Sequence, residues 1–300
     1  MKRPIRLNRD FLRKAWPNLD RGCPDPRGLL RSDIGAREAT AIIAKIKIGG
    51  VFKTTSYQRF PETTQLLANI PFSSPPVILD VGASDGSSSL SIMEVVSFAR
   101  YYVTDRHIEA YACKTRSGAF FCDAEHTPFM YANELFVIYN DMKKALWPLS
   151  AIARKLFSGF DISNYEDVRK VILMNPELQR RIGGEIRLER YNIFEPWPHE
   201  KANLVIAANI LNRGYFSDSQ LNDALRNLKG ALKNFGRLAL IENRPAEQSN
   251  IFRLQDGKFV VESEVGRGSD IKSLVTTLGD VDVSEVGRPR GMIWKDARSP

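Results

Sequence analysis

The chain has 300 residues, of which 43% are hydrophobic and 26% are charged, and its formal net charge is +8 at pH 7. This length suits one large domain or two small ones. The hydrophobic content allows a buried core without resembling that of a membrane protein. No run of residues approaches the roughly 20 apolar positions that are needed to cross a bilayer.

Cysteine and charge patterns further limit the classes of protein that fit the sequence. Cys23, Cys113 and Cys122 include no C-x-x-C pair, and an odd number argues against a disulfide framework. We therefore expect no metal site and a reducing, cytoplasmic compartment. The basic N-terminus, MKRPIRLNRDFLRKAWP, lacks the apolar centre of a secretory signal. Because much of the positive charge lies in the termini, a solvated basic tail is favoured over a nucleic-acid groove.

The first 70 residues are the least regular part of the chain. Helices are predicted over Ile34–Lys47, where apolar residues recur at helical spacing, and over Pro61–Asn69, where proline can occupy the first turn. Prolines interrupt the segment that precedes them, at Pro4, Pro17, Pro24 and Pro26. We expect residues 1–70 to form an N-terminal arm that packs over the core.

A glycine-rich turn follows the first clear strand. Val77–Leu79 is an apolar run suited to a buried strand, Asp80 ends it, and Ser87 begins a helix after the small residues of Gly82–Gly86. Strand, glycine-rich turn and helix together hold nucleotides in α/β folds, since backbone N–H groups and the helix N-terminus face the ligand. The pattern G-x-G-x-x-G is not met, and an ordinary turn without a ligand fits the same residues.

A second acidic residue ends the next predicted strand. Tyr101–Thr104 has the composition of a strand, and Asp105 follows it, 25 positions after Asp80. In nucleotide-binding α/β sheets an acidic residue in this place accepts hydrogen bonds from ribose hydroxyls. A carboxylate suits that task because it offers two acceptor oxygens to neighbouring donors.

The chain alternates regularly again from residue 186. Strands are predicted over Ile186–Tyr191, Asn203–Ala207 and Arg237–Glu242. An amphipathic helix over Asp218–Leu232 precedes the last of these, with leucines on one face. Beyond it we expect a hairpin around Asp256-Gly257 and then the following elements: a helix over Ile271–Leu278 capped by Asp270, and strands over Val281–Val286 and Met292–Lys295.

These segments resemble the class I S-adenosylmethionine-dependent methyltransferases. That family has an acidic residue followed by G-x-G-x-G, here Asp80, Gly82, Ser84 and Gly86. The stretch NLVIAANILN, followed by LRNLKGALKNFGRLALIEN, is similar to its fourth and fifth strands. The resemblance covers residues 77–106 and 186–243. It implies a Rossmann-like α/β domain over residues 71–300, with a mostly parallel seven-stranded sheet.

The resemblance also implies roles for the residues of the glycine-rich turn. Gly82, Ala83, Ser84 and Gly86 would line the methionine part of S-adenosylmethionine, and Asp80 would support the loop. Ser84 stands where the family pattern has a glycine.

Residues after the other strands receive roles in the same way. Asp105, followed by Arg106, would hold the ribose. Asn192 stands where the family often has an acidic residue near the adenine amino group, and Ile193 would flank the adenine. Asn209 would face the reactive methyl group.

Methyl transfer requires alignment and a dry pocket more than chemical groups from the protein. A neutral hydroxyl acceptor needs a base, whereas a carboxylate or a free amine does not. The sequence offers Glu242, at the end of the fifth strand, and His126, at a predicted hairpin turn, as candidate bases. A solvated turn residue is the alternative for His126.

Residues 108–185 are predicted to be an insertion that covers the substrate. A hairpin is expected over 119–131, and short helices over Asp167–Met174 and Glu177–Ile182. The segment Met142–Phe160 fits either a helical lid or an interfacial membrane helix, and Pro148 favours the lid. The aromatic residues of the insertion suit an acceptor pocket, although they would equally form a core of its own.

The sequence therefore predicts a methyltransferase for a small-molecule or saccharide acceptor, with O-methyl transfer as the favoured reaction. The N/D-P-P-Y/F tetrapeptide that marks methylation of nucleic-acid amino groups is absent after the fourth strand. A protein carboxyl methyltransferase is one alternative, because residues 209–212 are similar to those of chemotaxis-receptor glutamate methyltransferases. A non-catalytic scaffold that keeps the cofactor fold is the other, because Ser84 and Asn192 depart from the family pattern.

Overall fold

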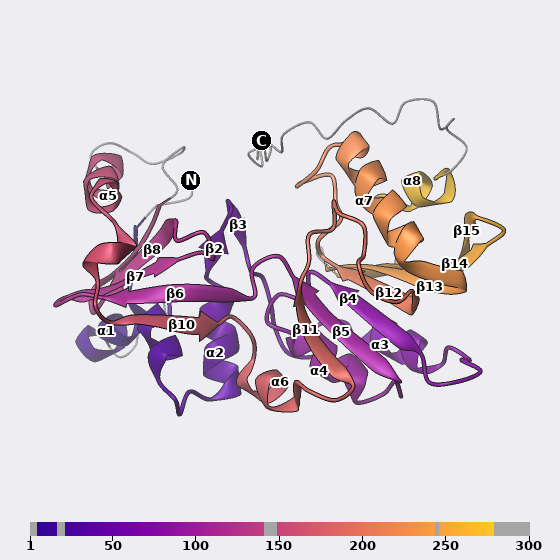
Figure 1. The fold of residues 1–300 in the computed structure, drawn as a ribbon, viewed down its shortest axis with the longest axis horizontal. Helices are drawn as coiled ribbons and strands as arrows, with labels where there is room; N and C mark the ends of the chain where they lie inside the picture. The colour runs from indigo at the N-terminus through magenta and orange to yellow at the C-terminus, as the bar shows by residue number, and fades with distance from the viewer. Residues whose placement is uncertain (1–4, 17–21, 141–148, 244–245, 279–300) are drawn as a thin grey trace. The chain divides into compact units, whose positions relative to one another are not determined.

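The computed structural model describes residues 5–16, 22–140, 149–243 and 246–278 (Figure 1). The chain forms two compact units. One unit, here the parallel-sheet unit, comprises residues 57–83, 88–106 and 181–300. The other, here the antiparallel-sheet unit, comprises residues 1–56, 84–87 and 107–180. The chain therefore crosses from one unit to the other several times, once within the glycine-rich turn.

The parallel-sheet unit contains a seven-stranded sheet in the order β11-β5-β4-β12-β13-β14-β15. The first five strands in this order pair in parallel, and the last two pair antiparallel. The bounds are β4 (Val77–Val81), β5 (Arg100–Asp105), β11 (Ile186–Arg190), β12 (Ala202–Ala208), β13 (Leu232–Asn243), β14 (Glu247–Gln255) and β15 (Lys258–Val265). The predicted seven-stranded sheet is therefore present as a mixed sheet.

The hairpin around Asp256-Gly257 completes this sheet. Both turn residues have positive φ, 51° and 74°, as a tight two-residue hairpin turn requires. This hairpin is predicted from the sequence in addition to two later strands, over Val281–Val286 and Met292–Lys295. Those two ranges lie outside the described residues, and β14 and β15 occupy the sheet edge.

Helices cover both faces of the seven-stranded sheet (Figure 1). They are α3 (Pro61–Ala68), α4 (Ser87–Met93), α7 (Asp218–Ala231) and α8 (Lys272–Thr276). Alternate residues of β4 face opposite ways, as the strand pleat requires. Leu79 belongs to the core cluster that contains α7, whereas Asp80 bonds to Ser89 of α4.

Helix α7 begins as its sequence predicts. Ser217 and Gln220 form a capping box, which satisfies the first N–H groups of the helix. Leu221, Leu225 and Leu228 are fully buried against the sheet. The prediction for α8 is wrong in one respect, because Ile271 occupies the cap position and Asp270 donates its N–H to Glu242 instead.

The antiparallel-sheet unit contains a six-stranded sheet in the order β1-β9-β8-β7-β6-β10. All of its neighbouring strands run antiparallel. The bounds are β1 (Ile5–Leu7), β6 (Glu109–Lys114), β7 (Gly118–Cys122), β8 (Pro128–Asn133), β9 (Phe136–Tyr139) and β10 (Val168–Ile172). The other elements are α1 (Arg9–Ala15), η1 (Pro26–Leu30), α2 (Ala36–Ile43), β2 (Lys47–Ile48), β3 (Val51–Phe52), α5 (Leu149–Ser158), η2 (Ile162–Asn164) and α6 (Pro176–Arg181).

The first 56 residues are not a separate arm. Strand β1 joins the edge of the insertion's sheet, with Ile5 opposite Ile138. The division at residue 70 therefore differs from the one that the structure has. The physical reason is that the insertion's antiparallel sheet offers an open edge strand, and β1 satisfies its backbone groups by pairing with it.

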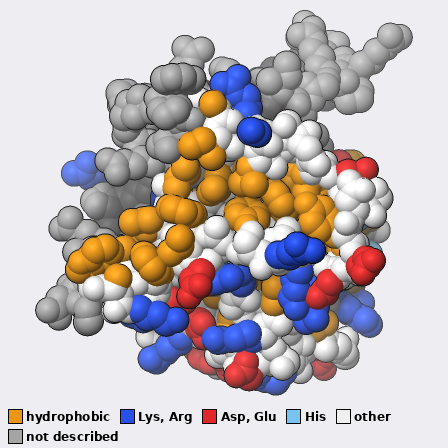
Figure 2. All heavy atoms as spheres, turned by 90° about the vertical axis from the view of Figure 1, so that its left-hand side faces the viewer, with side chains coloured by type: hydrophobic (Ala, Val, Ile, Leu, Met, Phe, Trp, Pro, Cys, Tyr) orange, Lys and Arg blue, Asp and Glu red, His pale blue; other side chains and the backbone are white. Residues whose placement is uncertain are grey.

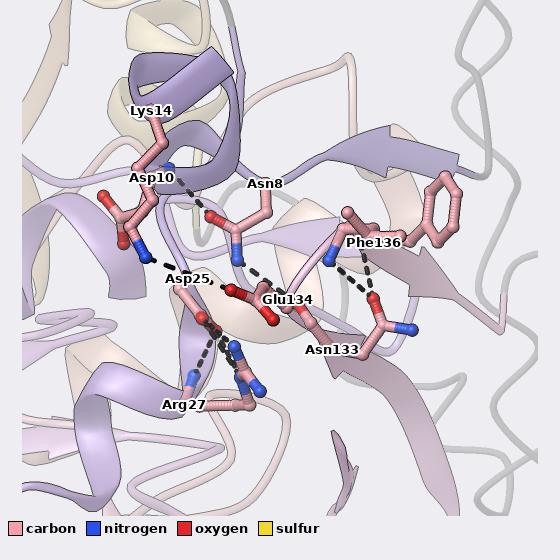
Figure 3. A network of polar contacts seen from close by, with 9 residues as sticks. Asn8, Asp10, Lys14, Asp25, Arg27, Asn133, Glu134 and Phe136 are labelled. Carbon is pink, nitrogen blue, oxygen red and sulfur yellow. Dashed lines mark hydrogen bonds and ion pairs between the residues drawn. The ribbon is translucent and has the colours of Figure 1, made fainter. Parts of the chain in front are cut away.

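A polar network fixes this N-terminal segment (Figure 3). Asn8 caps α1 through the N–H of Asp10 at 2.8 Å and donates its amide to the carbonyl of Asn133 at 3.2 Å. Asp25 accepts hydrogen bonds from the guanidinium of Arg27 through both carboxylate oxygens. These contacts hold the described part of the N-terminal segment in a folded conformation.

Residues 167–174 were expected to form a helix, and this prediction is wrong. They contain strand β10, which pairs with β6 from Val168↔Cys113 to Ile172↔Glu109. Pairing with a sheet edge outweighs the helical pattern of a short, mostly exposed segment. Of the predicted helix Met142–Phe160 the structure describes Leu149–Ser158, as α5. Residues 141–148, which include Pro148, lie outside the described ranges.

The aromatic residues of the insertion form its own two cores. Phe121 and Phe129 pack in one cluster with Ile43 of α2. Phe120 and Tyr131 pack in another with Phe157 of α5, with ring centroids 4.8 Å apart for Phe120 and Tyr131. The core alternative is therefore confirmed for these rings, whereas Phe136 is 37% exposed.

Hydrophobic side chains also gather on one outer face of the antiparallel-sheet unit (Figure 2). The exposed large hydrophobic side chains of this unit are Leu7, Trp16, Leu135, Phe136, Ile152 and Val168. Ile152 of α5 is 53% exposed, whereas Ala153 and Phe157 of the same helix are buried. The helix therefore packs on its own sheet with one side and presents an apolar residue on another.

We predict that Phe121→Ala destabilises the protein by about 3–5 kcal/mol, because it empties a fully buried site. Phe136→Ala is the matched control in the same sheet, and it should cost about 1 kcal/mol or less because that ring is 37% exposed. Urea unfolding followed by circular dichroism measures both. Equal losses would contradict the assignment of Phe121 to the core.

Candidate functional site

The carboxyl ends of the parallel strands lie at one edge of the seven-stranded sheet. Val81 of β4 pairs with Thr104 of β5 and with Ala207 of β12. Ala208 of β12 pairs with Ile241 of β13. The chain runs outward from β4 through β5 to β11 and then returns to β12 on the other side of β4. Open α/β sheets bind ligands at such a switch point, outside the carboxyl ends of the strands.

Asp80 supports the strand and the helix that flank the turn. Its carboxylate accepts hydrogen bonds from Ser89 at 2.7 Å and from the Tyr101 hydroxyl at 3.0 Å. Its carbonyl accepts from Thr104 at 2.9 Å. The side chain is 3% exposed, and burial raises its pKa to about 6, although the two hydrogen bonds act in the opposite direction. Asp80 is therefore a buried residue that links β4 to β5 and α4.

Gly82 begins the turn in a conformation that requires glycine. Its φ is +68°, and a Cβ placed on it would lie 2.7 Å from side-chain atoms of Ile210. Ile210 belongs to the loop that follows β12, so this close approach joins the two strands at the switch point. A Gly82→Val variant would damage the fold as well as any ligand site.

Two further residues of the turn have a left-handed backbone conformation. Ala83 donates its N–H to the carbonyl of Thr104 at 2.9 Å. Ser84 has φ +61° and Gly86 has φ +77°. Ser84 and Gly86 belong to the segment that packs with the antiparallel-sheet unit.

Asp105 is the last residue of β5, and its side chain is partly exposed. Its carbonyl accepts the N–H of Tyr191, which ties the ends of β5 and β11 together at 3.2 Å. Arg106, which follows, is also partly exposed. Asp105, which is predicted to bind the ribose, thus lies at the carboxyl edge of the sheet.

Asn192 and Ile193 follow β11. The Asn192 amide donates to Glu195 at 2.9 Å, and its carbonyl oxygen accepts the N–H of Phe194 at 3.3 Å. Ile193 is only 7% exposed and belongs to the core cluster of the sheet and α7. The structure therefore places Ile193 as a packing residue at this edge.

Asn209 bridges the ends of β12 and β13. Its N–H donates to Ile241 at 2.7 Å, and its side-chain oxygen accepts the N–H of Asn243 at 3.0 Å. Its φ is +57°, which asparagine tolerates better than most residues. The side-chain nitrogen Nδ2 is buried, and no described residue accepts a hydrogen bond from it. Asn209 thus holds an unused donor at the switch point.

Asn212 is a residue that the sequence analysis quotes but gives no role. It is 1% exposed, and its side-chain oxygen accepts the N–H of Gly214 at 3.0 Å. Its Nδ2 also has no acceptor among the described residues. The repeated asparagines in AANILN are the sequence signal that could have indicated it.

Glu242 lies at the end of β13 and is 9% exposed. It accepts hydrogen bonds from the Ser269 hydroxyl at 2.5 Å and from the N–H of Asp270 at 3.2 Å. Burial raises the pKa of its carboxyl group, and the Ser269 hydrogen bond opposes this shift. These contacts hold the turn between β15 and α8, which is a structural task that the sequence analysis does not foresee.

His126 lies in the antiparallel-sheet unit, in the turn between β7 and β8. It is exposed, has φ +61°, and packs against the edge of the Tyr111 ring at 5.1 Å between centroids. The structure therefore does not group it with the residues at the carboxyl edge of the parallel-sheet unit.

The carboxyl edge of the sheet carries both hydrogen-bond acceptors and donors. The partly exposed carboxylate of Asp105 supplies acceptors for hydroxyls, and the buried Nδ2 of Asn209 supplies a donor. Gly82 allows the left-handed conformation of the turn beside Ile210. In the described ranges, no group of three or more His, Cys, Asp or Glu side chains could hold a metal ion. No helix of those ranges is long and apolar enough to cross a membrane.

Comparison with protein-family models finds no match, and comparison with curated proteins finds none either. Among solved structures, the mitomycin 7-O-methyltransferase MmcR aligns over 61% of this chain and 35% of its own length, at 17% identity and TM-score 0.32. The N-methyltransferase NodS from Bradyrhizobium japonicum aligns over 60% and 66%, at 12% identity and TM-score 0.29. The O-methyltransferase NcsB1, in complex with S-adenosyl-L-homocysteine, aligns over 60% and 35%, at 13% identity and TM-score 0.32.

The aligned part is thus about a third of the length of MmcR and NcsB1, and about two thirds of NodS. Identities and TM-scores this low do not assign the chain to a family.

We predict that Asp80→Asn gains stability relative to the wild type as the pH rises. The folded-state pKa of Asp80 lies above its ordinary value of 3.8. The stability that protonated Asp80 gives the folded protein is therefore fully present below about pH 4. It is lost as the pH rises through about 6. Asparagine carries no charge at either pH. The difference between the two proteins should change by up to ~3 kcal/mol between pH 4 and pH 7.

Urea unfolding at several pH values measures this difference, and all other titrating groups cancel because both proteins share them. A difference that stays constant from pH 4 to pH 7 would show that Asp80 is not a buried, titrating group.

Proposed function

We propose that the chain is an S-adenosylmethionine-dependent methyltransferase of the class I type. The observation that carries the proposal is the arrangement at the switch point. The Gly82 turn and the unused Nδ2 donor of Asn209 follow adjacent parallel strands, and Asp105 ends the next strand on the other side of β4. This order of strands, turn and acidic residue is how α/β sheets hold a nucleoside.

Each residue has a task that follows from its chemistry. Asp105 would accept hydrogen bonds from the ribose hydroxyls. The backbone of the glycine-rich turn would approach the amino-acid part of the cofactor, because Gly82 and Gly86 allow its left-handed conformation. Asn209 Nδ2 would donate to a carboxylate oxygen of that part, which would satisfy a buried donor. When bound, S-adenosylmethionine supplies a methyl group activated by a sulfonium centre.

The protein would contribute alignment and exclusion of water. Glu242 already accepts two hydrogen bonds in the structure. Its carboxyl group therefore serves the turn between β15 and α8, and we do not assign it as a base for a neutral alcohol. We propose a small-molecule acceptor whose attacking oxygen is already ionised at neutral pH, such as a carboxylate.

A non-catalytic protein that keeps the cofactor fold is the second candidate. The observation that favours it is the Asn192 amide, which bonds to Glu195 in the same loop. A binding module would take up the cofactor without transferring its methyl group. Incubation with labelled S-adenosylmethionine and a panel of carboxylic acids, phenols and saccharides separates the two, since only the enzyme labels an acceptor.

We predict that the wild-type chain binds S-adenosylmethionine and that Asp105→Ala weakens this binding at least about tenfold, because charge-assisted hydrogen bonds to hydroxyls are lost. Isothermal titration calorimetry measures both affinities. Asp223→Ala, an exposed change on α7, is the control and should leave affinity within about twofold. An analogue without ribose hydroxyls should bind the Asp105→Ala variant and the wild type about equally. If the variant keeps full affinity, Asp105 is not the ribose ligand.

We predict further that Asn209→Asp weakens cofactor binding at least about tenfold while the protein stays folded. The change keeps the side-chain oxygen that accepts the N–H of Asn243, and aspartate tolerates the positive φ. It replaces the donor nitrogen with an acceptor, which would repel a carboxylate. Calorimetry at several salt concentrations checks the charge effect. Unchanged affinity in a folded variant would remove Asn209 from the cofactor site.

A further inference from the structure

A second buried carboxylate lies in the glycine-rich turn, at Asp85. It is fully buried and belongs to the antiparallel-sheet unit together with Ser84 and Ser87. Asp85 accepts hydrogen bonds from the N–H of Ser87 at 3.0 Å and from its hydroxyl at 2.8 Å. These two bonds close the turn on itself, but they involve only half of the donors that surround the carboxylate.

The other donors come from the N-terminal segment. The hydroxyl of Thr40, in helix α2, donates to Asp85 at 2.7 Å, and the hydroxyl of Thr55 donates to its second oxygen. Thr40 lies 45 positions before Asp85 in the sequence and is 5% exposed. The carboxylate is thus held by residues far from it along the chain.

The insertion adds a third anchor through Asn175. Its N–H donates to the carbonyl of Asp85 at 2.8 Å. Its side-chain nitrogen donates to the hydroxyls of Thr40 at 3.1 Å and Ser87 at 3.2 Å. Asn175 is fully buried, so the turn, the N-terminal helix and the insertion meet in one closed hydrogen-bond network.

The turn needs such support because its backbone is strained. Ser84 is not glycine but has φ +61°, and such a left-handed residue costs about 1–2 kcal/mol. A strained conformation persists only where its surroundings over-determine it, and this commonly happens at ligand sites. Asp85 directly follows Ser84, so the network fixes the strained residue from one side.

We infer that Asp85 is a positioning residue for the cofactor turn, and that Thr40, Thr55 and Asn175 set the cofactor affinity through it. This inference rests on the proposed function. The N-terminal segment and the insertion would therefore contribute to cofactor binding. From the sequence, the first is expected only to pack over the core and the second only to cover the substrate.

Paired threonine variants test the inference. Thr40→Val removes the hydroxyl but keeps the shape of the side chain, and Thr40→Ser keeps the hydroxyl. Thr63→Val is the matched control, because Thr63 is also a buried helical threonine and bonds to Ser249 in the parallel-sheet unit. Calorimetry with S-adenosylmethionine gives the affinity of each variant, and thermal melting gives its stability.

Thr40→Val should weaken cofactor binding at least about fivefold, whereas Thr40→Ser and Thr63→Val should stay within about twofold of the wild type. The two valine variants should lose similar stability, since each removes one buried hydrogen bond. Hydrogen exchange of the amides of residues 83–88 should accelerate in Thr40→Val only. Should Thr40→Val not fold, Thr55→Val takes its place, because Thr55 is only partly buried and less of the core depends on it.

The outcomes separate this inference from the proposed function. If the wild type binds no S-adenosylmethionine, the proposed function fails and the inference fails with it. If the wild type binds and the folded Thr40→Val or Thr55→Val variant binds equally well, only the inference fails. Equal weakening by Thr63→Val would also overturn it, because the effect would then follow general stability.

Discussion

The close approach of Gly82 to Ile210 is the constraint on which the candidate site depends. No Cβ fits at Gly82, so the turn after β4 and the loop after β12 meet directly. Strands β4 and β12 are neighbours in the sheet although more than a hundred residues separate them. This parallel pairing creates the switch point. The other residues of the site lie at the carboxyl ends of the neighbouring strands.

Two buried carboxylates flank the turn, and each is satisfied mainly by hydroxyl groups. Asp80 binds Ser89 and Tyr101 in the parallel-sheet unit. Asp85 binds Thr40, Thr55 and Ser87 in the antiparallel-sheet unit. Hydroxyls satisfy a buried carboxylate without adding a second charge that would also need burial. Buried hydrogen bonds therefore hold the residues on both sides of the turn.

Local patterns in the sequence predict much of the parallel-sheet unit. The apolar run of β4, the leucine spacing and capping box of α7, and the Asp256-Gly257 turn each depend on residues close together in the chain. The carboxyl-edge positions of Asp105 and Asn209 follow directly, because each residue ends or follows a strand. The hydrogen-bond partners of Asp105 and Asn209 cannot be predicted from the ends of the strands.

The sequence predicts the β7–β8 hairpin and helix α2 of the antiparallel-sheet unit, but not the pairing of its edge strands, for a physical reason. Strand β1 gains its partner from β9, with Ile5 opposite Ile138, and no local pattern marks a pairing over that separation. Strand β10 is short and mostly exposed, so its own residues favour no structure strongly, and pairing with β6 decides it. The bond between Thr40 and Asp85 is hidden for the same reason, and so is the structural task of Glu242.

A crystal structure of the chain with S-adenosyl-L-homocysteine tests the central claim most directly. The account predicts the ligand at the carboxyl edge of β4 and β12, with its ribose hydroxyls within hydrogen-bond distance of Asp105 and its amino-acid part against Gly82. Asn209 Nδ2 should then have an acceptor on the ligand. A ligand bound elsewhere on the chain, or crystals that show none at saturating concentration, would contradict it.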